Sequence, residues 1–175
     1  MIGAYYITSW KKKDMSKIVE VAKSYLGQEE IANNGGFKNK EFDKRMKEVG
    51  FSKGQAWCAY FAELVWKEAG EDVKPFSASA FKTYQNYEKA GRKGSIKPEV
   101  GALVVWRSVV NNVPQWTGHI GIVTEVLEDS FKTIEGNTND KGGREGIKVA
   151  AKTRTYNWKA DKGLRLIGFI NPNID

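Results

Sequence analysis

The chain has 175 residues, of which 41% are hydrophobic and 28% charged, a length and balance that predict one globular domain with a substantial core. No apolar run approaches the roughly 20 residues of a membrane-spanning helix, so we expect no transmembrane segment. Lys and Arg outnumber Asp and Glu by 28 to 21, and the net charge of +7 favours an anionic partner such as nucleic acid, lipid headgroups or the polymers of a bacterial envelope.

The beginning of the chain does not have the pattern of a secretory signal. A short apolar stretch, residues 1–7, precedes the positive cluster at residues 11–13, whereas a signal peptide places its charge first. We therefore expect a protein made in the cytoplasm without a signal peptide. The domain is expected to occupy residues 1–175, with its core between about residues 15 and 171.

Four helices are predicted in the first half of the chain. Apolar residues recur at helical spacing in each, and a glycine follows each one. The predicted helices cover residues 15–26 before Gly27 (with Asp14 or Ser16 as N-cap), a shorter segment around residues 42–49 before Gly50, residues 57–69 before Gly70, and residues 79–90 before Gly91.

After Pro98 the pattern changes to that of strands. Residues 102–106 are nearly all apolar, which predicts a central strand, and residues 128–130 suit a tight hairpin turn. Further strands are predicted at residues 119–127, 131–135, 147–151 and 164–170. Helices first and strands second predict an α+β fold, in which a helical N-terminal half packs on a C-terminal antiparallel sheet.

The single cysteine, Cys58, begins the third predicted helix. Unpaired N–H groups and the macrodipole at a helix N-terminus favour an anion, so the reactive thiolate is stabilised there. The same N–H groups suit the oxyanion of an acyl-transfer intermediate. Taken alone, a lone Cys beside Trp57 and Phe61 is more often a small buried hydrophobic residue.

The single histidine, His119, begins a predicted strand in which Ile120 and Ile122 alternate with His119 and Gly121. Gly121 is expected to leave room beside the imidazole for a ring or a substrate. An imidazole is the usual general base for a thiol nucleophile, although an isolated His is often only structural.

On the next predicted strand, Thr133, Glu135 and Asn137 share one face by alternation. A carboxylate or amide there would bond the second imidazole nitrogen and orient the ring. Cys at a helix start, His on a strand and Glu or Asn on the following strand is the papain-type order. Cys58 and His119 are 61 residues apart, which suits a crossing from helix to sheet, and His119 and Glu135 are 16 apart, which suits one hairpin.

Four short motifs together resemble the CHAP domain family. They are residues 57–62 (WCAYFA), 98–106 (PEVGALVVW), 118–123 (GHIGIV) and 135–137 (EGN). Their order and spacing carry the resemblance, which spans about residues 18–170. The NlpC/P60 wall peptidases share the same order and are closely related.

CHAP domains are cysteine-, histidine-dependent amidases and peptidases, so the resemblance implies a papain-like fold and hydrolysis of amide bonds in peptidoglycan. It implies that Cys58 is the nucleophile, His119 the base, Glu135 the orienting acid and Asn137 its accompanying amide. The chain departs from the family where many members carry Gln directly before the Cys, because Trp57 stands there and Gln55 lies two positions earlier. A second departure is Ala102, which stands where the family often has Asp after the Gly that begins the central strand.

These residues predict a thiol mechanism that needs no cofactor and no metal, since one His and one Cys make a zinc site improbable. Gln55 is a candidate second oxyanion donor beside the backbone N–H of Cys58. Trp57, Trp106 and Trp116 are candidate walls of a substrate groove, although aromatic residues near strands are more often core.

The function expected is that of a monomeric peptidoglycan hydrolase of the phage endolysin type, cutting either the muramoyl–L-alanine amide or a stem or crossbridge peptide bond after the membrane is breached. An antibacterial effector would have the same sequence features. The alternatives are a papain-like amidase acting on a small cytoplasmic amide and a non-catalytic virion or binding protein. Nucleic-acid binding is disfavoured because Lys and Arg are scattered and no recognition motif appears.

Overall fold

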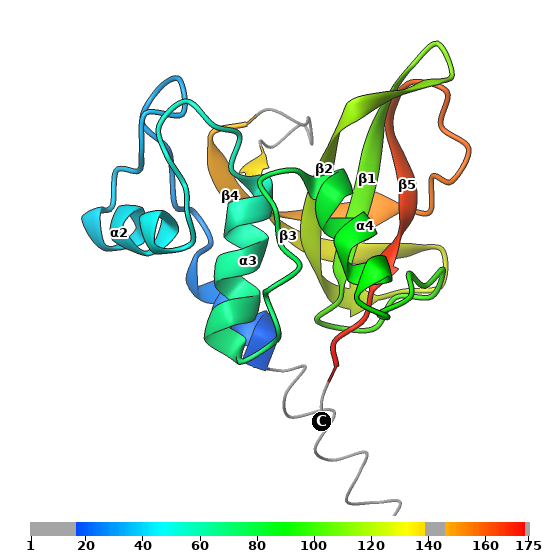
Figure 1. The fold of residues 1–175 in the computed structure, drawn as a ribbon, viewed down its shortest axis with the longest axis horizontal. Helices are drawn as coiled ribbons and strands as arrows, with labels where there is room; N and C mark the ends of the chain where they lie inside the picture. Colours follow the sequence, from blue (N-terminus) through cyan, green and yellow to red (C-terminus); the bar gives the residue numbers. More distant parts are fainter. Residues whose placement is uncertain (1–16, 139–145, 174–175) are drawn as a thin grey trace, which may run out of the picture.

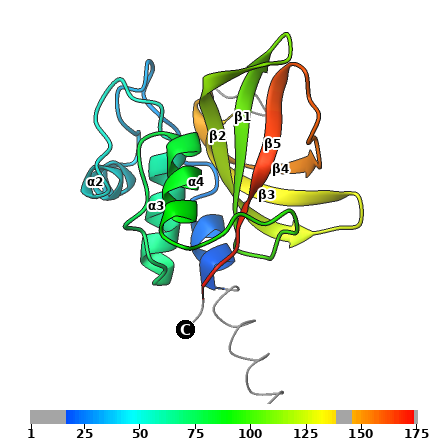
Figure 2. The same cartoon turned by 45° about the vertical axis from the view of Figure 1, so that its right-hand side comes forward.

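The computed structural model describes residues 17–138 and 146–173, with helices on one side and a sheet on the other (Figures 1 and 2). The first described helix covers residues 17–24. The others are α2 (Lys40–Glu48), α3 (Cys58–Ala69) and α4 (Ala80–Lys89). The predicted N-caps Asp14 and Ser16 lie outside the described residues. None of the helices within the described ranges is long and apolar enough to cross a membrane.

The sheet has five strands in the order β4-β3-β2-β1-β5, and all neighbours are antiparallel. The strands are β1 (Leu103–Val110), β2 (Val113–Val126), β3 (Ser130–Thr138), β4 (Lys148–Thr155) and β5 (Gly163–Ile170). The prediction of an α+β, papain-like fold is confirmed. The apolar strand β1 lies inside the sheet, between β2 and β5, as its composition predicts.

Helix ends follow the local sequence. The Asn39 side chain caps α2 by accepting from Phe42 N at 3.0 Å, and the Ser79 side chain caps α4 by accepting from Lys82 N at 3.2 Å. Helix α3 has Trp57 at its N-cap position and no side-chain cap hydrogen bond. The first N–H groups of α3 are therefore not occupied by a cap.

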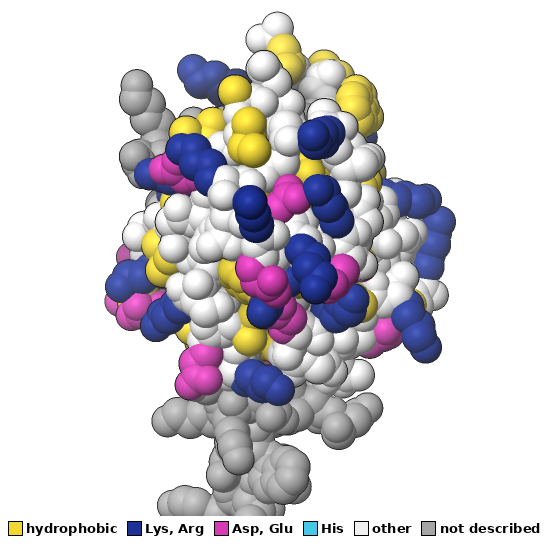
Figure 3. All heavy atoms as spheres, turned by 90° about the vertical axis from the view of Figure 1, so that its left-hand side faces the viewer, with side chains coloured by type: hydrophobic (Ala, Val, Ile, Leu, Met, Phe, Trp, Pro, Cys, Tyr) yellow, Lys and Arg dark blue, Asp and Glu magenta, His cyan; other side chains and the backbone are white. Residues whose placement is uncertain are grey.

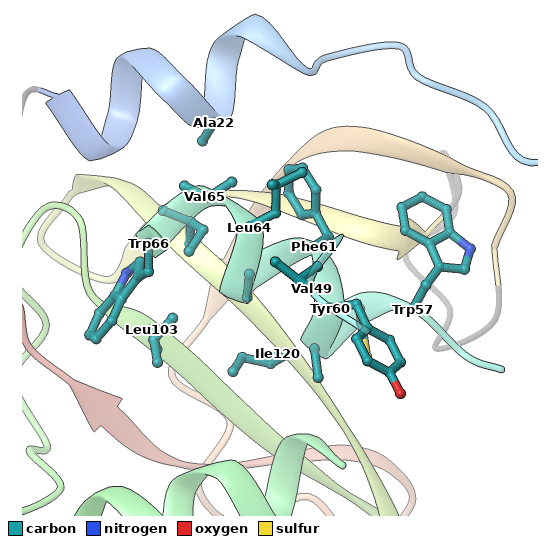
Figure 4. Packing of buried hydrophobic residues seen from close by; sticks show 14 of the residues in the cluster. Ala22, Val49, Trp57, Tyr60, Phe61, Leu64, Val65, Trp66, Leu103 and Ile120 are labelled. Carbon is teal, nitrogen blue, oxygen red and sulfur yellow. The ribbon is translucent and has the colours of Figure 1, made fainter. Parts of the chain in front are cut away.

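The main core lies between α3 and the sheet (Figure 4). Helix α3 is buried almost all round, since eight of its twelve residues are buried. Strand β1 directs Leu103 and Val105 toward this core and Val104 and Trp106 toward a second cluster on the other side. Because side chains alternate along a strand, both faces of β1 are covered.

Strand bounds differ from the prediction mainly at the β1–β2 hairpin. Strand β2 begins at Val113, six residues before His119, and β1 continues to Val110. The two turn residues, Asn111 and Asn112, have φ angles of 47° and 64°, the left-handed region that Asn tolerates in hairpin turns. Apart from Val109, the apolar side chains of this ribbon are exposed, so it lacks the alternation of buried and exposed residues from which strands are predicted.

Candidate active site

His119 and Glu135 form a hydrogen bond inside the protein. His119 lies on β2 and Glu135 on β3, and both are fully buried, at 0% exposure. His119 Nε2 is 2.8 Å from Glu135 Oε2. A carboxylate only accepts hydrogen bonds, so Nε2 carries the proton of this pair. The imidazole tautomer and orientation are fixed by this contact.

Glu135 has further partners on both of its oxygens. Thr133 Oγ1 donates to Oε1 at 2.6 Å, which confirms that Thr133 and Glu135 share a face of β3. Arg154, on β4, donates from Nε to Oε1 at 2.8 Å and from Nη2 to Oε2 at 2.5 Å. A carboxylate in this position is rigidly held because each of its oxygens accepts two hydrogen bonds.

The pKa values of His119 and Glu135 are shifted in opposite directions. Burial alone would raise the pKa of Glu135, but hydrogen bonds and charge from Arg154 and His119 lower it to about 2. Burial alone would lower the pKa of His119, but hydrogen bonding with Cys58 and Glu135, together with their charges, raises it to about 9. The imidazolium form of His119 is therefore favoured at neutral pH when its two neighbours are anionic.

Cys58 is the first residue of α3 and is 6% exposed. Its side chain is close enough to His119 to raise the pKa of the imidazole. No described residue makes a hydrogen bond of ordinary geometry to His119 Nδ1. Catalytic hydrogen bonds are often long until a substrate binds. Since Nε2 is bound to Glu135, Nδ1 is the nitrogen left to exchange a proton with the thiol.

A cavity of about 310 Å³ opens beside Cys58. Its walls come from the loop before α3, the start of α4 and the outer part of β2. Trp116, at 80% exposure, is the most exposed large apolar side chain among its lining residues. The lining residues are Gln55, Ala56, Cys58, Ala78, Ser79, Ala80, Trp116, Thr117 and Gly118.

Gln55 lines this cavity and has a fixed amide orientation. Its Oε1 accepts from Ser52 N at 3.1 Å, from Ser52 Oγ at 2.9 Å and from Tyr60 Oη at 3.0 Å. A backbone N–H can only donate, so the oxygen must face Ser52. The amide nitrogen is then the end of Gln55 that remains for a ligand.

Two of the three candidate tryptophans do not line the cavity. Trp57 is 0% exposed. Its indole packs edge-on against the buried Phe37 ring and donates to Glu30 Oε2 at 2.7 Å. Trp106 is 2% exposed and belongs to the second core cluster. The expectation that they form groove walls is corrected, and their role as core residues holds. Trp116 is the one of the three that borders the cavity.

Asn137 does not lie where simple alternation predicts. The pairing of β3 with β4 shifts between Glu135 and Thr138, and Asn137 has a φ of 52°, so the strand is interrupted at this residue. Its amide is buried, and neither amide atom has a hydrogen-bond partner within the described ranges. The hydrogen bond to His119 is made by Glu135. A part for Asn137 in catalysis stays a prediction.

Gly121 makes room for Glu135 rather than for a substrate. A Cβ atom at this position would lie 2.7 Å from Glu135 Cγ, closer than real Cβ contacts allow. Arg154 was missed by the sequence reasoning, because only the pairing of β3 with β4 shows that its long side chain spans to Glu135. Across the described parts of the chain, no group of three or more His, Cys, Asp or Glu side chains is placed to hold a metal ion.

A sequence model of the CHAP domain family matches residues 50–137, just over half of the chain. The matched segment includes Cys58, His119, Glu135 and the cavity lining. No curated protein and no solved structure matches the chain. Proteins of this family are in general hydrolytic amidases or peptidases that depend on a cysteine and a histidine. The chain belongs to the CHAP domain family.

Proposed function

We propose that this protein hydrolyses an amide bond of bacterial peptidoglycan by thiol catalysis, with Cys58 as nucleophile. The observation that carries the proposal is the arrangement of His119: one ring nitrogen is bound to a buried carboxylate, and the other is left for the thiol beside an open cavity. This arrangement supports roles for Cys58, His119 and Glu135 as nucleophile, base and orienting acid in covalent acyl transfer.

In the first half of the reaction, the Cys58 thiolate attacks the amide carbonyl carbon and forms a tetrahedral intermediate. The backbone N–H of Cys58, at the uncapped start of α3, and the amide nitrogen of Gln55 stabilise the oxyanion. The C–N bond then breaks, and His119 Nδ1 gives its proton to the leaving amine. The product of this half is a thioester on Cys58 and a free amine.

In the second half, water attacks the thioester. Neutral His119 takes a proton from this water at Nδ1, and the carbon–sulfur bond breaks to release a carboxylic acid and the Cys58 thiolate. His119 is then protonated again, beside Glu135, and the starting ion pair is restored. The Nε2 contact with Glu135 is kept throughout, so the ring does not turn between the two halves.

Peptidoglycan as substrate is supported by the family and by the shape and charge of the molecule. The cavity continues to the exposed indole of Trp116, a surface on which a sugar or an apolar part of a stem peptide can stack. Basic and acidic side chains are interspersed on the face in Figure 3, and the net charge of +7 suits general attraction to an anionic envelope. Action on the wall after release or delivery, as by an endolysin or an antibacterial effector, belongs to the same proposal.

Mass spectrometry of purified peptidoglycan, digested by the wild type and by Cys58→Ala, tests the function. New termini made only by the wild type would establish hydrolysis through Cys58. The new ends also name the bond, because a free muramoyl carboxylate marks an amidase and a new peptide terminus marks an endopeptidase. Unchanged peptidoglycan from several wall chemotypes would contradict the proposal.

A further inference from the structure

Arg154 reaches the active site from β4, outside the segment matched by the family. Its guanidinium binds both oxygens of Glu135 in the forked geometry of the strongest Arg–carboxylate pairs, with distances of 2.8 Å and 2.5 Å. The Arg154 side chain is 17% exposed and Glu135 is fully buried. This pair is therefore shielded from the screening that weakens ion pairs at the surface.

One tryptophan ring holds Arg154 and His119 in relation to each other. The Arg154 guanidinium lies 5.0 Å from the centroid of the Trp106 ring. The His119 ring lies 5.7 Å from Trp106, tilted by 30°. Because Trp106 is packed in the second core cluster, the positions of the cation and the imidazole are both fixed by the core.

The charge of Arg154 matters because His119 changes its own charge during the reaction. When His119 is neutral, Glu135 is a fully buried carboxylate, which is costly unless another cation compensates it. A guanidinium is a permanent cation in proteins, so Arg154 supplies that compensation at every step. Without it, Glu135 would compete with His119 for the proton that has to move between Nδ1, the thiol and the substrate.

We propose that Arg154 is a positioning residue of this active site, holding Glu135 as an oriented carboxylate and setting the pH range over which Cys58 and His119 form an ion pair. The inference rests on the thiol mechanism proposed above. The charged and titratable groups that act on His119 are Cys58 from α3 and Glu135 from β3, with Arg154 from β4 acting through Glu135.

The sequence makes the test unusually direct, because the chain has one Cys and one His. Iodoacetamide alkylation measured against pH reports Cys58 alone, and ¹⁵N-histidine NMR reports the protonation and tautomer of His119 alone. In Arg154→Gln, loss of a nearby positive charge raises the pKa of the neighbouring groups. We expect the alkylation profile and the His119 titration to move to higher pH by about one unit. Arg154→Lys keeps the charge without the fork and should move them by about half a unit.

Arg92→Gln is the matched control. Arg92 also pairs with a carboxylate, Glu71, at 3.5 Å and lies 5.2 Å from the Trp66 ring, but at the opposite end of α3 from Cys58. This variant should not change the pH dependence of Cys58 alkylation or of the His119 NMR signals. Unchanged titrations in Arg154→Gln, or an equal movement in Arg92→Gln, would overturn the proposal.

Thermal unfolding shows whether Arg154→Gln is folded. If Arg154→Gln is unfolded, the test rests on Arg154→Lys. An unchanged Cys58 alkylation profile and His119 titration in that variant would overturn the inference. Neither titration needs a substrate. A wild type that shows the expected titrations but cuts no peptidoglycan would therefore contradict the proposed function and leave the assignment of Arg154 standing.

Discussion

His119 Nε2 and Glu135 Oε2 lie 2.8 Å apart on neighbouring strands, with both side chains fully shielded from solvent. The same carboxylate accepts from Thr133 and Arg154, so its position does not depend on His119 alone. The strands of the sheet therefore fix the orientation of the imidazole. The proposed nucleophile, Cys58, comes from helix α3, which packs against the sheet.

Replacing Glu135 by Gln removes the charge and keeps the shape. We expect kcat/KM to fall by about 10³-fold to 10⁴-fold, because an amide no longer selects the tautomer with the proton on Nε2. Arg154 is left without its anion, so the free energy of unfolding should fall by about 3 kcal/mol. Urea denaturation and wall-hydrolysis kinetics measure the two effects. Glu125→Gln, which breaks the exposed pair with Lys132, is the control and should cost less than about 1 kcal/mol.

Stability should depend on pH in two windows. The pKa of Glu135 falls from 4.5 to about 2 on folding, so its contribution is present above about 4.5 and is lost as the pH falls toward 2. The pKa of His119 rises from 6.5 to about 9, so its contribution is present below about 6.5 and is lost as the pH rises toward 9. Urea midpoints between pH 2 and pH 10 measure both windows. An alkaline decrease of the same size in His119→Gln would show that another group causes it.

Gly121→Ala should disturb catalysis although residue 121 itself takes no part in the chemistry. The added methyl group would lie 2.7 Å from Glu135 Cγ and push the carboxylate away from His119. We expect kcat to fall at least about tenfold and the free energy of unfolding to fall by about 1–3 kcal/mol. Gly94→Ala is a useful comparison, since its methyl group meets the side chain of Tyr84 instead. Equal loss of activity in both variants would argue against a specific effect on Glu135.

Gln55→Ala tests the second oxyanion donor. If the Gln55 amide nitrogen stabilises the developing oxyanion, kcat should fall by about 10²-fold to 10³-fold while KM changes little. The Gln55 oxygen also anchors Ser52 and Tyr60. Tyr60→Phe, which removes one of these anchors and keeps the amide, separates loop stability from oxyanion binding. Loss of the same size in Tyr60→Phe would assign the effect to the loop.

Trp116→Ala tests substrate binding next to the cavity. Because this indole is 80% exposed, its removal should change the free energy of unfolding by less than about 0.5 kcal/mol. We expect KM for wall fragments to rise by about fivefold to twentyfold, corresponding to a contact of about 1–2 kcal/mol, with kcat nearly unchanged. Val113→Ala, on the same strand but outside the cavity lining, should leave KM in place. A Trp116→Ala enzyme with unaltered KM would exclude the indole from substrate binding.

Much of this site can be predicted from the sequence, since a single Cys and a single His leave little choice. The start of α3 at Cys58 follows from the apolar stripe that ends before Gly70, and alternation brings Thr133 and Glu135 to one face. These signals are local. They depend only on helical or strand periodicity within a few residues.

The parts that could not be predicted depend on contacts between distant strands. Trp57 and Trp106 are buried and Trp116 is exposed, and residue type alone does not show this difference, because the packing of other elements decides which ring is covered. Arg154 reaches Glu135 only through the pairing of β3 with β4. Asn137 departs from alternation because of a register shift that no residue pattern announces.

The buried ion pair also has a consequence for how the enzyme becomes active. Cys58 comes from α3, whereas His119, Glu135 and Arg154 come from three adjacent strands that follow it along the chain. Contacts between residues far apart in the sequence, such as that of α3 with the sheet, close long loops, and this entropic cost slows their formation. The Arg154–Glu135 pair is completed only once β4 has joined the sheet, so a chain that ends before β4 should lack the full site.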